Sequence, residues 1–569
     1  MGAYRARNDR RLSKGKMKLW HKTGNNKFGW LIGVLLLVLF RPYLSAGVPF
    51  THDGENHLAR FANYKVAVRE GQLPPRFAPN LVNHYGYPVF NYNYPLANLL
   101  SLPPSILGVS YELTFKILMM GALLMAVVGT AMWLKLLGFS RSARWIAGGA
   151  LLVAPFTANL IYVRGNVGEV LALGLFPWLL WLTKRLEKKE SVNWFTSVSL
   201  ILAFLLSHNI SVLFGMALWL LYCWHSFKRH QVLWLSWLKP TILAGLLSLW
   251  FWLPALAEKN LVILAGSQLN NQTTDHLTQL QQLISSPLQF GYSYESAIDT
   301  LSFAVGLVPL TSLVIVSLWL IKFGRRQKTT SRQLIFWCLL SWWLLFLQTT
   351  QASWFWKNLP LVGFIQFPWR LSLFFLIFAT PLVAAVWRLG KSFSWLIFSL
   401  LIVQLINVSR LAPADRLHKT NLDYDLFSQS TSTLNENLPT QFTYLDFADW
   451  SPKPSIASGE ASFTVEHWTG SSRRYQLTVI QDALIVEPTM NFAGWQTRVN
   501  NQLVEHVNND LVQGRLAYQL PSGEYQVESR FTQQTWSRLV GNSISGLGLL
   551  VWGILIWQEK RHVFGKSSA

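Results

Sequence analysis

The sequence predicts a polytopic α-helical membrane protein of about twelve transmembrane helices, with a C-terminal extracytoplasmic β-sandwich domain. Hydrophobic residues make up 51% of the 569 residues and charged residues only 13%, with 28 Trp and 35 Phe. This composition is far from the balance of a soluble globular chain. The hydrophobic residues gather in runs of about 20, the length of a helix that crosses a bilayer. Before the last run lies an acidic segment with the alternating pattern of β-strands.

The basic residues follow the same division of the chain. A net charge of +22 is typical of many nucleic-acid-binding proteins, but those carry their basic residues on a folded soluble surface. Here the basic residues lie mostly in short connections between hydrophobic runs. We therefore expect no nucleic-acid partner, and the positive-inside rule predicts that these connections are cytoplasmic.

Residues 1–28 form a basic N-terminus, with nine Lys and Arg against the single acid Asp9. A hydrophobic run from about Trp30 to Phe40 follows, which is the charge order of a signal peptide or of a retained anchor. The next segment, RPYLSAGVPF, offers only a weak small-residue cleavage site. We therefore expect a retained helix whose N-terminus is cytoplasmic.

The membrane domain is predicted over residues 29–410. After the first helix, spans are expected near 112–136, 143–162, 168–183, 193–207, 210–226, 239–256, 301–322, 332–348, 370–388, 392–409 and 538–557. Every second connection is basic and is therefore expected on the cytoplasmic side, which gives twelve spans with both termini in the cytoplasm. The last helix and a basic tail occupy 537–569. The run Leu96–Val109 is too short for this series and contains Pro103-Pro104, so we expect a re-entrant or interfacial helix there.

Residues 411–536 are predicted to form the extracytoplasmic domain. They hold 14 of the chain's 27 acidic residues. Runs such as SFTVEHW, RYQLTVI, ALIVEP and YQVESRF alternate in strand fashion and are separated by Gly and Asn turn signals, which indicates an antiparallel sandwich. The Ser-, Thr- and Asn-rich part, about 412–440, is expected to be a poorly ordered linker.

The motifs that are missing narrow the chemistry. Cys223 and Cys338 both lie in predicted spans, so the sequence holds no disulfide framework and no CxxC zinc or redox motif. No Gly-rich phosphate loop follows a strand, and neither HExxH nor GxSxG occurs. A nucleotide-fuelled or soluble-hydrolase mechanism therefore has no support.

The predicted outer loop, 48–111, concentrates ionisable residues. Asp53, His57, Arg60 and Tyr64 have the spacing of one face of a single helix. Asp53 also precedes this helix directly, and Asp is a favoured N-cap residue. Two interpretations of Asp53 therefore stay open, a helix cap and a functional carboxylate.

Four further sites place ionisable residues near the outer face. Arg164 and Glu169, in YVRGNVGE, fit either a boundary ion pair or a site where guanidinium binds a lipid phosphate. Arg370, in GFIQFPWR, opens a span on the side where basic residues are rare, which makes it a second candidate for binding phosphate. His208 fits a turn between two spans and Glu258 an interfacial charge, with a functional role as the alternative for each.

Several short motifs together carry a resemblance. HDGENHLARF, GQLPPRF, YGYPVFNYNYP, YVRGNVGE, SHN and QFPWR resemble a family of bacterial membrane proteins labelled as 6-pyruvoyl-tetrahydropterin synthase-related, over about residues 30–410. The order of one span, an acidic first outer loop, many further spans and an outer β domain resembles the GT-C class of integral-membrane glycosyltransferases. Nothing here resembles the histidine ligand set of the soluble pterin synthase, a zinc enzyme, so the family label is not taken as an activity.

The GT-C resemblance implies a glycosyltransferase of the bacterial plasma membrane. It would transfer a sugar from a lipid-phosphate-linked (polyprenyl) donor to an envelope glycan or protein acceptor on the outer face, with Asp53 as the general base. The residues expected to bind the substrate or its lipid phosphate are His57, Arg60, Arg164, Glu169 and Arg370, and those expected to line a groove are Arg76, Tyr87, Tyr92, His208 and Glu258.

A second class of function is kept beside the enzyme. A non-catalytic transporter or assembly partner for lipid-linked envelope polysaccharide would need ionisable groups or broken helices near the middle of the bilayer. The predicted polar groups lie at the outer face instead, which favours the enzyme. No cofactor is predicted, and a divalent metal stays open as an alternative, although Asp53 and Glu55 alone do not make a convincing site.

Overall fold

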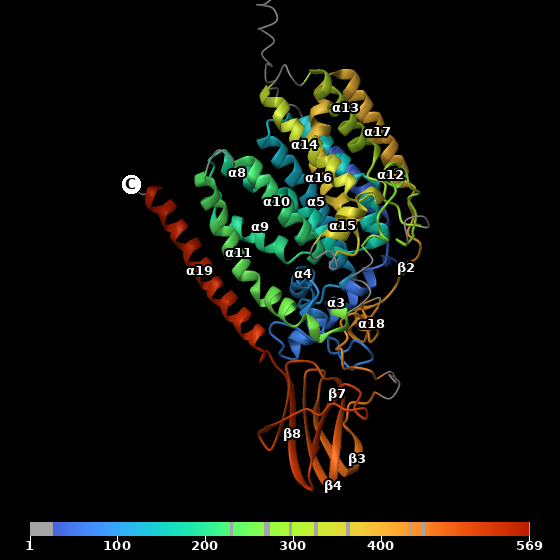
Figure 1. Ribbon diagram of the computed structural model, residues 1–569, viewed down its shortest axis with the longest axis vertical. Helices are drawn as coiled ribbons and strands as arrows, with labels where there is room; N and C mark the ends of the chain where they lie inside the picture. The colour runs from blue at the N-terminus through green and yellow to red at the C-terminus, as the bar shows by residue number, and fades with distance from the viewer. Residues whose placement is uncertain are drawn as a thin grey trace, which may run out of the picture.

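The computed structural model describes residues 27–227, 231–266, 273–294, 299–323, 328–359, 365–432, 434–444 and 450–567. Figure 1 shows a bundle of helices at one end of the long axis and a β-sheet domain at the other, with three shorter helices, α3, α4 and α18, between them. Most of the predicted basic N-terminus, 1–28, lies outside the described residues.

The helical elements follow the hydrophobic runs of the sequence. Their bounds are α2 (Lys27–Phe40), α3 (Gly54–Arg69), α4 (Leu96–Ile106), α5 (Tyr111–Leu136), α6 (Arg141–Leu152), α7 (Pro155–Asn159), η3 (Leu160–Arg164), α8 (Val167–Glu187), α9 (Trp194–Leu205), α10 (Asn209–Phe227), α11 (Gln231–Ala257), α12 (Leu280–Ile284), α13 (Leu307–Phe323), α14 (Lys328–Phe346), α15 (Ser353–Asn358), η10 (Pro368–Leu371), α16 (Ser372–Trp387), α17 (Lys391–Ser409), α18 (Asn421–Asp425) and α19 (Trp536–Ser567).

The described residues form seven helices that are long and apolar enough to cross a membrane, or eight if α6 and the bent segment Pro155–Arg164 are one broken span. Twelve spans are therefore not confirmed. Four other predicted spans form apolar helices of 10–17 residues, which is shorter than the roughly 20 residues that cross a bilayer untilted. The predicted interfacial segment is helix α4, which is short as well and contains both prolines, Pro103 and Pro104.

The surfaces of the helices fit a membrane protein. Helix α8 is buried along nearly its whole length, and Gly174 lets it approach α5, because a Cβ there would lie 2.6 Å from the Ala122 carbonyl oxygen. Small residues at close helix crossings are typical of membrane bundles. Helix α19 instead keeps large apolar side chains such as Leu547 and Leu550 exposed. We interpret this exposed face as one that contacts lipid.

The C-terminal domain is an antiparallel sheet of six strands. These are β3 (Ser455–Trp468), β4 (Ser472–Met490), β5 (Trp495–Val499), β6 (Gln502–Val504), β7 (Arg515–Leu520) and β8 (Gly523–Phe531). The order is β3-β4-β8-β5-β6, and β7 also pairs with β4. The predicted sandwich is not confirmed. Two strands expected from RYQLTVI and ALIVEP are one 19-residue strand, β4, whose first half pairs with β8 and whose second half pairs with β7.

The segment before this sheet is not a loose linker, contrary to the expectation for residues 412–440. Strand β2 (Arg416–Leu417) pairs with β1 (Val48–Pro49), and α18 packs on α3. A salt bridge of 3.1 Å joins Lys65 of α3 to Asp425 of α18. The described part of this segment therefore holds α3 in place, at the junction of the two domains.

Candidate functional site

Two loops that are far apart in the sequence form the frame of the site. The backbone N–H of His52 donates to the Val163 carbonyl and that of Asp53 to the Arg164 carbonyl, each at 2.9 Å. The chain then turns through Gly165, which has a left-handed φ of 61°. A Cβ there would lie 2.0 Å from the Thr51 hydroxyl oxygen. Only glycine allows this close approach, so Asp53 and Arg164 are held side by side by their backbones.

Asp53 precedes α3 at its N-cap position, but its side chain does not cap the helix. The Thr51 hydroxyl instead accepts the N–H of Gly54 at 3.0 Å. The Asp53 carboxylate turns to the other loop, where Oδ2 lies 3.3 Å from Arg164 Nη2 and accepts Asn166 Nδ2 at 3.0 Å. Of the two interpretations of Asp53, the geometry therefore disfavours simple capping.

Glu169, in the first turn of α8, gathers three cationic or titratable groups. Its Oε1 lies 2.7 Å from Arg370 Nε, 3.4 Å from Arg164 Nη2 and 3.7 Å from His208 Nε2. The residue is only 1% exposed, and its other carboxylate oxygen has no hydrogen-bond partner among the described residues. We call Asp53, Arg164, Glu169, Arg370 and His208 the charge cluster.

Two histidines border the two carboxylates. The Ser211 N–H donates to His208 Nδ1 at 3.2 Å, so a neutral His208 carries its proton on Nε2, which faces Glu169. His57 Nε2 lies 3.4 Å from the Tyr94 hydroxyl, and that hydroxyl donates to Asn166 Oδ1 at 2.9 Å. Asn166 therefore links this tyrosine and histidine to Asp53.

The helices place the cluster at their N-terminal ends. Asp53 precedes α3, Glu169 lies in the first turn of α8, His208 precedes α10, and Arg370 lies in η10 directly before α16. Helix N-termini carry partial positive charge and attract anions. Together with Arg164, these ends form a setting suited to an anion.

Burial and the neighbouring charges set the protonation states of Asp53 and His57. Burial alone would raise the pKa of Asp53, but the Arg164 guanidinium, with His57 and the Asn166 hydrogen bond, lowers that pKa to about 2. Burial lowers the pKa of His57 to about 3, helped by the nearby charge of Arg60. At neutral pH Asp53 is therefore ionised and His57 is neutral.

Aromatic rings cover the cluster. The Arg164 guanidinium lies 5.4 Å from the centre of the Trp369 ring, and that of Arg370 lies 4.9 Å from the Phe367 ring. His52, next to Asp53, stacks on Tyr292 with ring centres 4.6 Å apart. Such cation–π and stacking contacts stabilise charges away from water.

Other predicted site residues lie elsewhere. The Arg60 Nε–H donates to the Thr431 hydroxyl at 3.2 Å. The predicted helix face exists, but the Arg60 guanidinium binds the segment before the β-sheet domain. Tyr64 packs edge-on against Phe90, with ring centres 5.1 Å apart. Tyr87 accepts the Asn437 N–H at 3.0 Å in a separate buried contact.

Three predicted groove residues belong to a second cluster around Glu258. Its carboxylate accepts Arg538 Nη2 at 2.7 Å and Asn91 Nδ2 at 2.9 Å, as well as two hydroxyls of α19 and the segment before it. Tyr92 donates to the Glu258 carbonyl at 2.8 Å, and Arg76 Nε donates to Gln533 at 3.3 Å. The Glu258 carboxylate is fully bonded and joins the end of α11 to α19, whereas Arg76 Nη1 and Asn91 Oδ1 are buried without a hydrogen-bond partner among the described residues.

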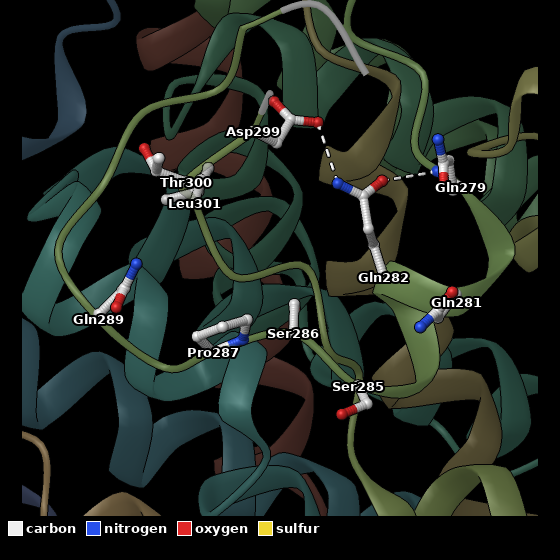
Figure 2. Close-up of a pocket in the computed structure, with 10 residues that line it drawn as sticks. All are labelled: Gln279, Gln281, Gln282, Ser285, Ser286, Pro287, Gln289, Asp299, Thr300 and Leu301. Carbon is white, nitrogen blue, oxygen red and sulfur yellow. Dashed lines mark hydrogen bonds between the residues drawn. The ribbon is translucent and has the colours of Figure 1, made fainter. Parts of the chain in front are cut away.

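The cavity in Figure 2 is lined by residues within 279–301 and has a volume of about 300 Å³. None of the predicted site residues lines it. Among the described residues, no group of three or more His, Cys, Asp and Glu side chains is arranged to hold a metal ion.

The sequence interpretation missed three residues of the site, Tyr94, Asn166 and Trp369. Asn166 carried a detectable signal, because it lies three residues before an acidic residue at the start of a hydrophobic run, as an N-cap does. Its side chain accepts the Glu169 N–H at 3.0 Å as that cap. Its bonds to Tyr94 and Asp53 depend on tertiary structure.

No family model and no curated protein matches the chain. Among solved structures, the chain is similar to the cryo-EM structure of arabinofuranosyltransferase AftD from Mycobacteria, with a TM-score of 0.43 and 14% identity over 68% of this chain. The match spans 27% of the length of AftD. A similarity this weak carries no argument about activity or substrate. The resemblance to the pterin-synthase-related membrane family gains no support from these comparisons.

Proposed function

We propose that the chain is a GT-C-type membrane glycosyltransferase that uses a polyprenyl-phosphate-linked sugar donor and a cell-envelope acceptor, with Asp53 as its general base. One observation carries this proposal: the Asp53 carboxylate leaves the end of its own helix and joins a buried cluster that contains two guanidinium groups. A base beside two cationic groups is the arrangement that transfer from a phosphate donor needs.

The proposed reaction exchanges one bond at the anomeric carbon of the donor sugar. An acceptor hydroxyl oxygen attacks that carbon, and its proton passes to the Asp53 carboxylate. The bond between the anomeric carbon and the phosphate oxygen breaks, and the lipid phosphate leaves with the electron pair. Arg164 and Arg370 stabilise the negative charge that grows on the phosphate.

Binding of the donor would also tune the base. The pKa of Asp53 is low because Arg164 outweighs the effect of burial, and a carboxylate with so low a pKa is a weak base. A phosphate that draws Arg164 toward itself would leave burial as the dominant influence, which raises the pKa of Asp53. Donor binding would thus make Asp53 a better proton acceptor.

The position of the cluster separates this proposal from a transporter or assembly partner. A transporter is expected to have ionisable groups or broken helices near the middle of the bilayer. The described residues include one broken pair, α6 with Pro155–Arg164, and this pair ends at the charge cluster. The charge cluster lies at helix ends, where α8, α10 and α16 begin. We place this end on the extracytoplasmic side, together with the β-sheet domain, because the charge pattern of the connections favours both termini in the cytoplasm.

Asp53 and Glu55 offer a matched pair of variants for testing the base. Both lie at the start of α3, but Glu55 pairs with Lys419 and takes no part in the charge cluster. We expect Asp53→Asn to abolish a surface-glycan modification in cells while Glu55→Gln leaves it intact, at equal protein levels in the membrane. A normal glycan profile in cells with Asp53→Asn would reject Asp53 as the base.

A further inference from the structure

The cavity in Figure 2 has an unusual lining. Gln282 lies in its centre, between Asp299 and Gln279, and Gln289 lies on the opposite wall. Among the described lining residues, most side chains end in an amide or a hydroxyl, and none is Lys or Arg. The volume of about 300 Å³ is at the small end of ligand pockets.

Part of this polar lining is already bonded. Gln282 Nε2 donates to Asp299 at 3.3 Å, and its Oε1 accepts the Gln279 N–H at 2.7 Å. The second Asp299 oxygen accepts the N–H of Tyr294 at 2.7 Å. These bonds hold the two walls of the cavity together, and both oxygens of the Asp299 carboxylate accept a hydrogen bond.

Another part of the lining is unused. The side chains of Gln281, Ser285 and Gln289 line the solvent-exposed mouth of the cavity, and none has a hydrogen-bond partner in the part of the chain that the structure describes. An amide offers both donors and an acceptor, and a hydroxyl offers one donor and two acceptor lone pairs. Neutral groups of this kind match a ligand whose own groups both donate and accept, which is the chemistry of sugar hydroxyls.

Both walls of the cavity touch the surroundings of the charge cluster. The wall with Gln289 continues into Phe290 and Tyr292, whose rings contact His52 at 5.2 and 4.6 Å between centres. The opposite wall continues into Phe303, whose ring centre is 5.8 Å from that of Trp369. The segments that line the cavity therefore continue into aromatic residues that contact His52 and Trp369, the neighbours of Asp53 and Arg370.

Two tyrosines extend the first wall. Tyr292 and Tyr294 are 47% and 46% exposed, and their ring centres are 6.1 Å apart. A tyrosine ring combines an apolar face with a polar hydroxyl. Such rings suit the mixed surface of a sugar, which has C–H faces and hydroxyl edges.

We propose that this cavity binds an uncharged carbohydrate, as a subsite for the acceptor glycan. This assignment rests on the proposed transferase function and narrows its acceptor to a neutral glycan. We assign the phosphate of the donor instead to Arg164 and Arg370, because phosphate is bound by cationic groups and the described residues that line the cavity include no Lys or Arg.

The test is binding of the full-length protein, in lipid nanodiscs, to an array of neutral and charged glycans. We expect at least one neutral glycan to bind, and the double variant Gln281→Leu/Gln289→Leu to weaken that binding about tenfold or more through two lost polar contacts. Gln502→Leu, an exposed glutamine on β6, is the matched control and should bind as the wild type does.

Three results would overturn the assignment: no binding of any neutral glycan, binding that the double variant leaves unchanged, or selection of charged glycans alone. The transfer activity of Asp53→Asn tests the proposed base, and the glycan binding of the double variant tests the subsite, so the two proposals can fail separately. If Asp53→Asn keeps its transfer activity while the double variant loses glycan binding, the proposed base fails and the subsite stands. If Asp53→Asn loses activity while the double variant binds normally, the subsite fails and the base stands.

Discussion

The charge cluster makes a sharp prediction about stability. Glu169 is buried and is the only carboxylate within 4 Å of Arg370 among the described residues. Replacing one member of a buried ion pair costs about 3–5 kcal/mol, because the other charge is left uncompensated. Glu169→Gln leaves the Arg370 guanidinium buried without a compensating charge. Arg370→Gln costs less, because Glu169 keeps Arg164 at 3.4 Å.

The double variant Glu169→Gln/Arg370→Gln restores the balance, since Asp53 and Arg164 remain as a pair. We expect it to be more stable than Glu169→Gln alone, with a coupling energy of about 3 kcal/mol. Thermal unfolding of the four proteins in detergent, followed by tryptophan fluorescence, measures this. Glu112→Gln, which breaks a more exposed pair with Lys116, should cost only about 0.5 kcal/mol. If the costs of the two cluster substitutions simply add, the cluster is not electrostatically coupled and this reasoning is wrong.

Three further predictions concern the frame, the protonation and the second cluster. Gly165→Ala should lower the melting temperature, because its Cβ would clash with Thr51 at a left-handed backbone position, whereas Gly245→Ala, with open space around it, should not. The pKa of His57 falls to about 3 on folding. The unfolded state therefore takes up a proton at a higher pH than the folded state, and the stability falls as the pH drops from about 6.5 toward 3. His57→Gln should flatten this pH dependence by up to about 1.4 kcal/mol per pH unit, measured by thermal unfolding at several pH values. Glu258→Gln should cost about 3 kcal/mol, because it leaves the fully buried Arg538 unpaired, and an unchanged melting temperature would contradict that role.

The first loop shows how far periodicity alone leads. The spacing of Asp53, His57, Arg60 and Tyr64 predicts a helix there, and α3 occupies Gly54–Arg69. Periodicity assigns a shared face but not the partner of each side chain. Arg60 is bound by Thr431, a residue 371 positions away, and no local pattern contains that contact.

The β-sheet domain shows a different limit. The sequence predicts two strands, RYQLTVI and ALIVEP, on either side of Gln481 and Asp482. In the structure β4 passes straight through them, since its pairing moves from β8 to β7 at this point. The length of β4 is set by its two partner strands, β8 and β7. The sequence of β4 alone does not show where these strands pair with it.

The charge cluster could be predicted from the sequence only in part. Charge parity and the positions of Arg164, Glu169 and Arg370 at the starts of hydrophobic runs predicted a common side of the membrane. That they meet within 3.4 Å follows from the pairing of two loops and from Gly165. These are tertiary features that a single sequence does not specify.

The central claim is that Asp53 is the base of a transfer from a lipid phosphate. Release of polyprenyl phosphate from a polyprenyl-phosphate-linked monosaccharide, by proteoliposomes supplied with envelope glycan, measures this reaction directly. We expect Asp53→Asn to lower the rate about 100-fold or more, the usual contribution of a general base, and Glu55→Gln to leave it unchanged. A rate for Asp53→Asn close to that of the wild type would contradict the account.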